Sequence, residues 1–262
     1  MPHSRWSFVP AALLWVAGLS IPLPAAARSA LRIETPVTYG KIPAATYDMD
    51  RTQVGIAGIF IEKNEDGSVI MSLDEGFTRG ARTLVRARLE PVGDGMLAPV
   101  HQESRSFDTD GTPLGVLTVD HKASLATCTS PQGEVREVSL PEGDRVANST
   151  LNLLLLPLVR GELQEIDFQL FFCGGGAKLV DFVANLAPAS RQHGAGEVVE
   201  VRYGPDFGFA SLIARSFVPK LSVWFESSAP YKWLAHRLPL YSGGPEVFVI
   251  RNGVPLRWLA NE

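Results

Sequence analysis

The histidines of this chain are the residues best suited to acid–base or metal chemistry, and they are dispersed. Beyond residue 27 they are His101, His121, His193 and His236. None has a second ligand at the spacing of a zinc motif, so the sequence predicts no metal site. Asp120 lies next to His121, but adjacent residues on a strand point to opposite faces, which argues against joint action.

Nucleophile and phosphate motifs are also missing. Ser211 lacks the flanking glycines of a strand-to-helix nucleophile turn. Gly174, Gly175 and Gly176 lack the Lys-Ser/Thr of a phosphate-binding loop, so we interpret them as a turn. We expect binding rather than catalysis and no cofactor, although a catalytic triad assembled in space stays open.

Two cysteines, Cys128 and Cys173, form the smallest set that can make one disulfide. In an exported protein such a bridge would close a loop of about 46 residues and stabilise the fold by roughly 4 kcal/mol. The alternative is two small apolar side chains buried on strands. The sequence leaves both interpretations open.

The densest aromatic region spans residues 231–241. Its side chains Tyr231, Trp233, His236 and Tyr241 are of the types that form a ligand mouth or a partner surface, apolar on one side and wet on the other. The alternative is a loop that packs across the open edge of a sheet and closes the core.

Composition and the amino-terminal segment indicate a compartment. Hydrophobic residues make up 45%, charged residues 20%, and the net charge is -4, which excludes a disordered acidic chain and a basic nucleic-acid binder. Residues 1–27 hold Arg5, an apolar stretch and a final Ala-Ala-Ala, which predicts a cleavable secretory signal, with an uncleaved anchor as the alternative. We therefore expect an exported, periplasmic protein without a transmembrane segment after cleavage, and one β-rich domain over residues 28–262.

Short β-branched and aromatic runs separated by turn residues predict the strands. Residues 55–62 and 69–74 are expected to form a hairpin across Asp66-Gly67. Further strands are expected at residues 83–89, 165–173, 178–185, 197–203 and 220–226. A last hairpin should pair residues 246–251 with 254–259 around Asn252-Gly253.

One segment has helical periodicity. Leucine and valine side chains at positions 151, 154, 155, 158 and 159 form a single stripe. Asn148 or Ser149 is the expected N-cap, and Pro157 should end or kink this two-turn helix near Leu156. The fold class predicted is mainly β (α+β), a curved antiparallel sheet or incomplete β-barrel with one or two short helices.

This order of elements resembles secreted bacterial domains of unknown function related to the lipoprotein-localisation carriers. The resemblance is carried by residues 47–75, with their Asp-Gly turn, and by residues 148–226, with the Leu-rich helix and the strands after it. It implies an incomplete barrel wrapped around a few helices, with a concave sheet face able to hold an acyl chain. The chain departs from these carriers in lacking a lipid-anchoring cysteine and in its tail, residues 236–259.

Several expected strands carry more apolar side chains than a sheet with one wet face needs, which agrees with a cavity. The expected ligand-binding side chains are Phe168, Leu170, Phe172, Val180 and Phe182. We therefore hypothesise an envelope protein that binds a lipid-like or otherwise apolar ligand. The alternative hypothesis is an envelope interaction or structural module that uses residues 231–241.

Overall fold

The protein is built on one large antiparallel sheet. The computed structural model describes residues 30–255 apart from 79, 175, 189–197, 207–220 and 240–244. The predictions for residues 1–27, His193, Ser211, Tyr241 and residues 256–259 lie outside the described residues.

The first arm of the sheet follows the chain as consecutive hairpins. Its strands are β1 (Ile33–Glu34), β2 (Gly40–Asp48), β3 (Gln53–Lys63), β4 (Val69–Phe77), β5 (Arg82–Gly93), β6 (Met96–Phe107), β7 (Pro113–Asp120), β8 (Leu125–Thr129) and β9 (Val135–Ser139). After β2, each of these strands pairs with the one before it, and the short β1 pairs with β6.

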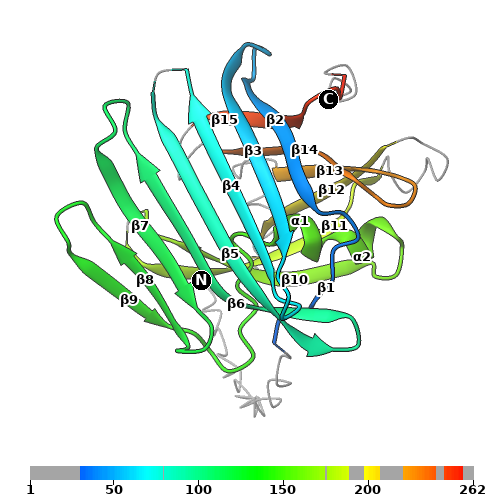
Figure 1. Ribbon diagram of the computed structural model, residues 1–262, viewed down its shortest axis with the longest axis horizontal. Coiled ribbons are helices and arrows are strands. Elements are labelled where there is room, and N and C mark those ends of the chain that lie inside the picture. Colours follow the sequence, from blue (N-terminus) through cyan, green and yellow to red (C-terminus); the bar gives the residue numbers. More distant parts are fainter. Residues whose placement is uncertain are drawn as a thin grey trace, which may run out of the picture.

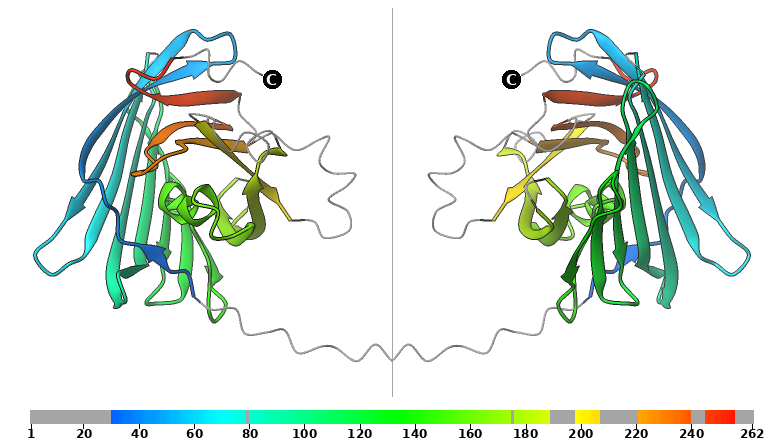
Figure 2. Two further views of the ribbon diagram at one scale, coloured as in Figure 1. Left: turned by 90° about the vertical axis from the view of Figure 1, so that its right-hand side faces the viewer. Right: turned by 90° about the vertical axis from the view of Figure 1, so that its left-hand side faces the viewer.

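The second arm is another run of consecutive antiparallel strands. Its members are β10 (Glu165–Phe172), β11 (Lys178–Leu186), β12 (Val198–Pro205), β13 (Leu221–Glu226), β14 (Trp233–Pro239) and β15 (Glu246–Arg251). Because β15 pairs with β2, the two arms form one 15-stranded sheet with β9 and β10 at its ends. The sheet curls so that its arms face each other, and the helical segment lies between them (Figures 1 and 2). The predicted curved, incomplete barrel is confirmed.

Side-chain alternation decides which face of the sheet turns inward. On β3, Ala57, Ile59 and Ile61 belong to the core, whereas Ile56 is 66% exposed on the outer face. Successive strand residues point to opposite faces, so every second residue lines the concave side. The predicted hairpin of residues 55–62 and 69–74 is confirmed as β3 and β4.

The helical segment is short and bent. α1 (Leu151–Leu154) and α2 (Leu156–Val159) meet at Leu155. Pro157 lies in the first turn of α2, where a missing N–H breaks no helical hydrogen bond, so the bend falls where the sequence predicts it. The N-cap prediction is wrong, since α1 begins after Thr150. Asn148 instead pairs its amide with the backbone N–H and C=O of Phe171 on β10.

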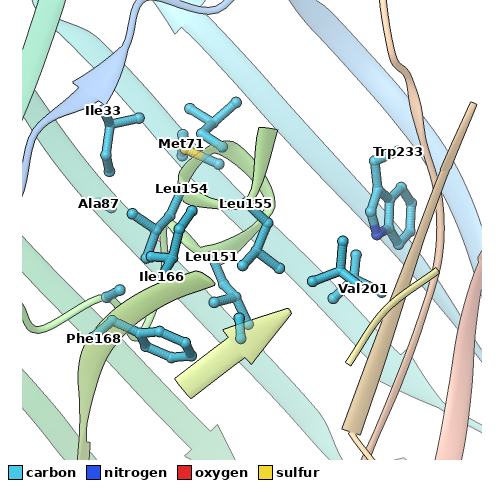
Figure 3. Packing of buried hydrophobic residues seen from close by; sticks show 14 of the residues in the cluster. Ile33, Met71, Ala87, Leu151, Leu154, Leu155, Ile166, Phe168, Val201 and Trp233 are labelled. Atoms are coloured by element: carbon cyan, nitrogen blue, oxygen red, sulfur yellow. The ribbon is translucent and has the colours of Figure 1, made fainter. Parts of the chain in front are cut away.

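The main core lies between the helical segment and the concave face (Figure 3). Leu154, Leu155 and Leu158 are buried against side chains from both arms, including Met71 of β4 and Phe168 of β10. Burying a Leu side chain contributes roughly 1.5–3 kcal/mol. The helix thereby fills part of the space that the curled sheet encloses.

A disulfide and a backbone bridge join the two ends of the sheet. Cys128 on β8 is bonded to Cys173, the residue after β10. Residues 145–147 run beside β10, where the N–H of Gln169 donates to the C=O of Arg145 and the N–H of Ala147 donates to the C=O of Gln169. These contacts protect the middle of the free edge of β10 and tie the two ends of the curled sheet together.

Gln102 of β6 fastens the same connecting segment to the first arm. It is fully buried, its Nε2 donates to the Val146 C=O at 2.8 Å, and its Oε1 accepts from the Ser149 N–H at 2.8 Å. The Nε2 atoms of Gln102 and His121 are also 2.8 Å apart, and His121 Nδ1 lies 2.8 Å from Asp144 Oδ1. These bonds satisfy the buried amide and position the segment that leads into α1.

The interpretation of residues 231–241 as a loop over the sheet edge is wrong for residues 233–239. They form β14, which pairs with β13 on one side and β15 on the other. β14 buries both faces at its start, because Trp233 belongs to the main core and Leu234 to a second cluster on the outer face. A strand buried on both faces shows no alternation of polar and apolar residues, which removes its sequence signal.

Candidate functional pocket

A half-open apolar pocket lies between the helical segment and the concave face of the sheet. Its apolar walls are Ile42, Ile59, Ile61 and Met71 from β2–β4, Leu153 and Leu156 from the helical segment, and Phe225 and Trp233 from β13 and β14. Its cavity volume is about 70 Å³. A water molecule needs roughly 10–15 Å³ of such space, so the pocket has room for a short apolar segment rather than a bulky group.

Strand register brings the aromatic wall into place. A bulge between Trp224 and Phe225 shifts the pairing so that Phe225 faces Trp233 across β13 and β14. Both side chains belong to the main core. The extra residue of the bulge is Leu234 on β14, which has no partner on β13.

Two segments without regular structure form the mouth. Residues 36–38 cross from β1 to β2, and Val37, which lines the pocket, is 76% exposed. The β13–β14 turn contributes Pro230, Tyr231 and Lys232. Tyr231 has φ +53°, a conformation uncommon for a bulky residue and held here by its N–H donating to the Ser228 C=O.

Polar groups at the pocket are few. Arg251 and Lys232 line it, together with Thr38 and Asn152. Trp233 is 7% exposed, and its Nε1–H has no hydrogen-bond partner among the described residues. A buried donor without a partner costs about 1–3 kcal/mol, and because this nitrogen has almost no accessible surface, the pocket reaches other atoms of the Trp233 ring.

The predicted ligand-binding side chains lie elsewhere on the concave face. Phe168 and Phe182 are buried in the core with ring centroids 5.6 Å apart, and Phe172 stacks on Phe182 at 6.1 Å. Leu170 and Val180 are partly buried against the same core. None of the five lines the pocket described here. Their contact with a ligand stays a prediction.

The predicted interaction residues separate in the structure. Tyr231 and Trp233 line the pocket, with Trp233 inside the fold rather than on an exposed face. His236 lies farther along β14, where its Nε2 is 2.6 Å from the Tyr203 hydroxyl. Use of this region by a protein partner stays a prediction.

Tyr203 and His236 form a buried neutral pair. Burial raises the pKa of Tyr203, so its hydroxyl stays protonated and donates to His236 Nε2. Burial also lowers the pKa of His236 to about 4, because the enclosed ring disfavours the charged form. The pair therefore stabilises the second arm near neutral pH.

A second buried polar pair lies on the first arm. The Thr46 hydroxyl donates to Glu75 Oε1, and both residues are buried. Burial raises the pKa of the Glu75 carboxyl, and the Thr46 hydrogen bond partly opposes that shift. Gly55 of β3 pairs with Thr46 of β2 and leaves room for this contact. A Cβ added at Gly55 would lie 2.8 Å from the Gly76 O and 3.3 Å from the Thr46 Cβ.

The histidine chemistry considered from sequence is not assembled as a catalytic unit in the described residues. His121 pairs with Asp144 rather than Asp120, and the Gln102 amide occupies its other ring nitrogen. Within residues 30–255, apart from the gaps stated above, no cluster of three or more His, Cys, Asp or Glu side chains could hold a metal. The described part of the chain also contains no helix long and apolar enough to cross a membrane.

Comparison with known proteins identifies similar structures but no family. No family model matches the chain, and no curated protein matches it. A beta-barrel-like protein of Domain of Unknown Function DUF1849 from Brucella abortus is 10% identical over 86% of this chain and 97% of that chain, with a TM-score of 0.46. A protein with a YmcC-like fold from Bacteroides fragilis is 8% identical over 84% of this chain and 98% of that chain, with a TM-score of 0.25. The description of the fold therefore rests on the strand pairing of this chain.

Proposed function

We propose that this chain is exported to the periplasm, where it binds a lipid-like or otherwise apolar ligand in the pocket at the helix end of its incomplete barrel. The observation that carries the proposal is the half-open pocket itself, which is walled by aliphatic and aromatic side chains from both arms and the helix. Binding there rests on burial of apolar surface, at about 25 cal/mol per Å². No covalent step is part of the proposal.

The pocket has the features of a binding site rather than a packing defect. It opens between two irregular segments, and an exposed Val37 extends the apolar surface to the mouth. Apolar walls with few polar groups are the usual composition of small-molecule sites.

A matched pair of substitutions on β3 tests the proposal. Ile59→Phe adds volume on the inner face, where Ile59 is 9% exposed and lines the pocket. Ile56→Phe makes the same chemical change on the outer face of the same strand, where the side chain is 66% exposed. Binding of the dye cis-parinaric acid, a single fluorescent hydrocarbon chain with a carboxylate end, is followed by fluorescence, with folding checked by circular dichroism.

We expect saturable dye binding to the unmodified protein and to Ile56→Phe, and at least a tenfold weaker affinity in Ile59→Phe. Equal affinity in the two variants would place the dye outside this pocket and refute the proposal. If Ile59→Phe does not fold, Ile42→Phe provides the second test, because Ile42 lines the same pocket and is only partly buried.

Mass spectrometry provides a test without an added probe. The mature protein is purified from the exporting cell, measured under native conditions and extracted with solvent. We expect a lipid-sized adduct that is depleted in Ile59→Phe and retained in Ile56→Phe. An adduct of equal abundance in both variants would contradict the assignment to this pocket.

A further inference from the structure

We infer that the ligand of this pocket is a single-chain amphiphile with an anionic carboxylate or phosphate head group, which Arg251 and Lys232 bind at the pocket mouth. This inference rests on the function proposed above and narrows the class of ligand. Its basis is the charge and hydrogen-bonding chemistry of the lining residues.

The charged residues among the described lining of the pocket are both cations. Arg251 ends β15 and Lys232 immediately precedes β14, while no Asp or Glu is among the lining residues that the structure describes. The whole chain has a net charge of -4, so this pairing of cations is opposite in sign to the protein as a whole. A local positive potential at an apolar opening favours a ligand with a negative end.

Arg251 is available for such a ligand. Its side chain is half-buried and forms no ion pair or hydrogen bond with the described part of the chain. Lys232 has one acidic neighbour, Glu226, with 3.5 Å between Lys232 Nζ and Glu226 Oε2. The Lys232 side chain is 39% exposed, so this pair is solvent-screened and does not prevent Lys232 from turning to a second anion.

The hydrogen-bonding capacity of the site points to the same class. Arginine and lysine are donors only, with no acceptor atom. At this pocket those groups are Arg251 and Lys232, and the nearby Thr38 and Asn152 side chains can either donate or accept. Carboxylate and phosphate oxygens are acceptors, so they match the site better than an ammonium head, and better than a hydroxyl head in both charge and number of acceptors.

The size of the pocket indicates that the ligand carries a single hydrocarbon chain. A cavity of about 70 Å³ accepts a short length of one chain, and the exposed Val37 gives the next part of that chain an apolar surface at the mouth. The head group then lies at the opening, where the two cations are. A ligand that carries several chains would leave most of its apolar surface in water.

The test compares ligands with the same chain and different heads. Isothermal titration measures binding of decanoate, decyl phosphate, decanol and decyltrimethylammonium, each below its aggregation concentration. We expect decanoate or decyl phosphate to bind at least tenfold more tightly than decanol, and decyltrimethylammonium to bind most weakly. The preferred anion distinguishes a carboxylate ligand from a phosphate ligand.

Charge-removing variants assign the head-group site. Arg251→Gln and Lys232→Gln should each weaken decanoate binding about tenfold and weaken decanol binding by a much smaller factor. The control is Arg136→Gln, a change to an exposed arginine on β9 that should alter neither affinity. Equal loss in all three variants would indicate a general charge effect and overturn the assignment.

The outcomes separate the two levels of the hypothesis. Equal affinity for decanoate and decanol would overturn the anionic head group and leave the apolar pocket standing. Tighter binding of decyltrimethylammonium than of decanoate would do the same. If none of the four binds, both the head group and the proposed function are refuted.

Discussion

Protonation of His236 should destabilise the folded protein in mild acid. Its Nε2 accepts a hydrogen bond from Tyr203, and burial lowers its pKa from 6.5 to about 4. Because the pKa of His236 is lowered only in the folded state, His236 of the unfolded chain binds a proton at a higher pH than His236 of the folded protein. The stabilising contribution is therefore present above about pH 6.5 and is lost as the pH falls toward about 4.

The size of the effect follows from that shift. A difference of about 2.5 pKa units corresponds to about 3.4 kcal/mol when the pH is below both values, and to about 2 kcal/mol near pH 5. These values are upper limits, since His236 as a whole residue is only half-buried and solvent screens part of its charge. A loss of about 1–2 kcal/mol near pH 5 is a large share of the stability of a typical domain.

Urea unfolding of the unmodified protein and of His236→Gln near pH 7 and pH 5 measures this loss. Glutamine keeps an acceptor for the Tyr203 hydroxyl but does not titrate, so the variant should lose about 1–2 kcal/mol less than the unmodified protein. His101→Gln on β6 serves as a matched control and should behave as the unmodified protein does. An equal loss in His236→Gln and the unmodified protein would refute the reasoning.

Three further changes test the parts that hold the barrel. The double substitution Cys128→Ser and Cys173→Ser should lower the free energy of unfolding by about 4 kcal/mol in the chain-entropy model, because the bridge joins residues 45 apart. An unchanged urea midpoint would contradict this. Glu75→Gln should raise the melting temperature near neutral pH and change it little below about pH 4. Burial raises the pKa of Glu75, so ionisation of its carboxyl opposes folding only as the pH rises. A lower melting temperature of the variant at neutral pH would refute this prediction. Gln102→Leu leaves the three hydrogen-bond partners of Gln102 unpaired and should lower the free energy of unfolding by about 3 kcal/mol. Hydrogen exchange at the Ser149 amide should become faster. Unchanged exchange at that amide would show that Gln102 does not hold the segment that leads into α1.

The sequence predicts the elements whose signals are local. The Asp66-Gly67 turn and the alternation around it define the β3–β4 hairpin, and the Leu stripe with Pro157 defines the bent helix. Phe168 and Phe182, expected to share a concave face, pair directly across β10 and β11. Each of these patterns depends on neighbours within a few residues or on one hairpin.

The pocket could not be predicted in the same way. Its walls come from residues far apart in the chain, such as Ile42, Leu153 and Trp233, and long-range contacts such as the pairing of β15 with β2 bring the two arms together. Periodicity indicates which face of a strand is apolar, but not whether another side chain or a cavity covers it. That is why Phe168, an apolar residue on the concave face, is part of the core, whereas Trp233 lines the pocket.

The proposed amphiphile places its hydrocarbon chain in the pocket between the helix and the concave face. Crystals of the protein grown with a fatty acid brominated at its terminal carbon would locate that carbon by anomalous scattering. We expect a bromine peak beside Leu153, Met71 and Trp233, with the carboxylate near Arg251. Bromine bound only at another site, or no bromine at a saturating concentration, would contradict it.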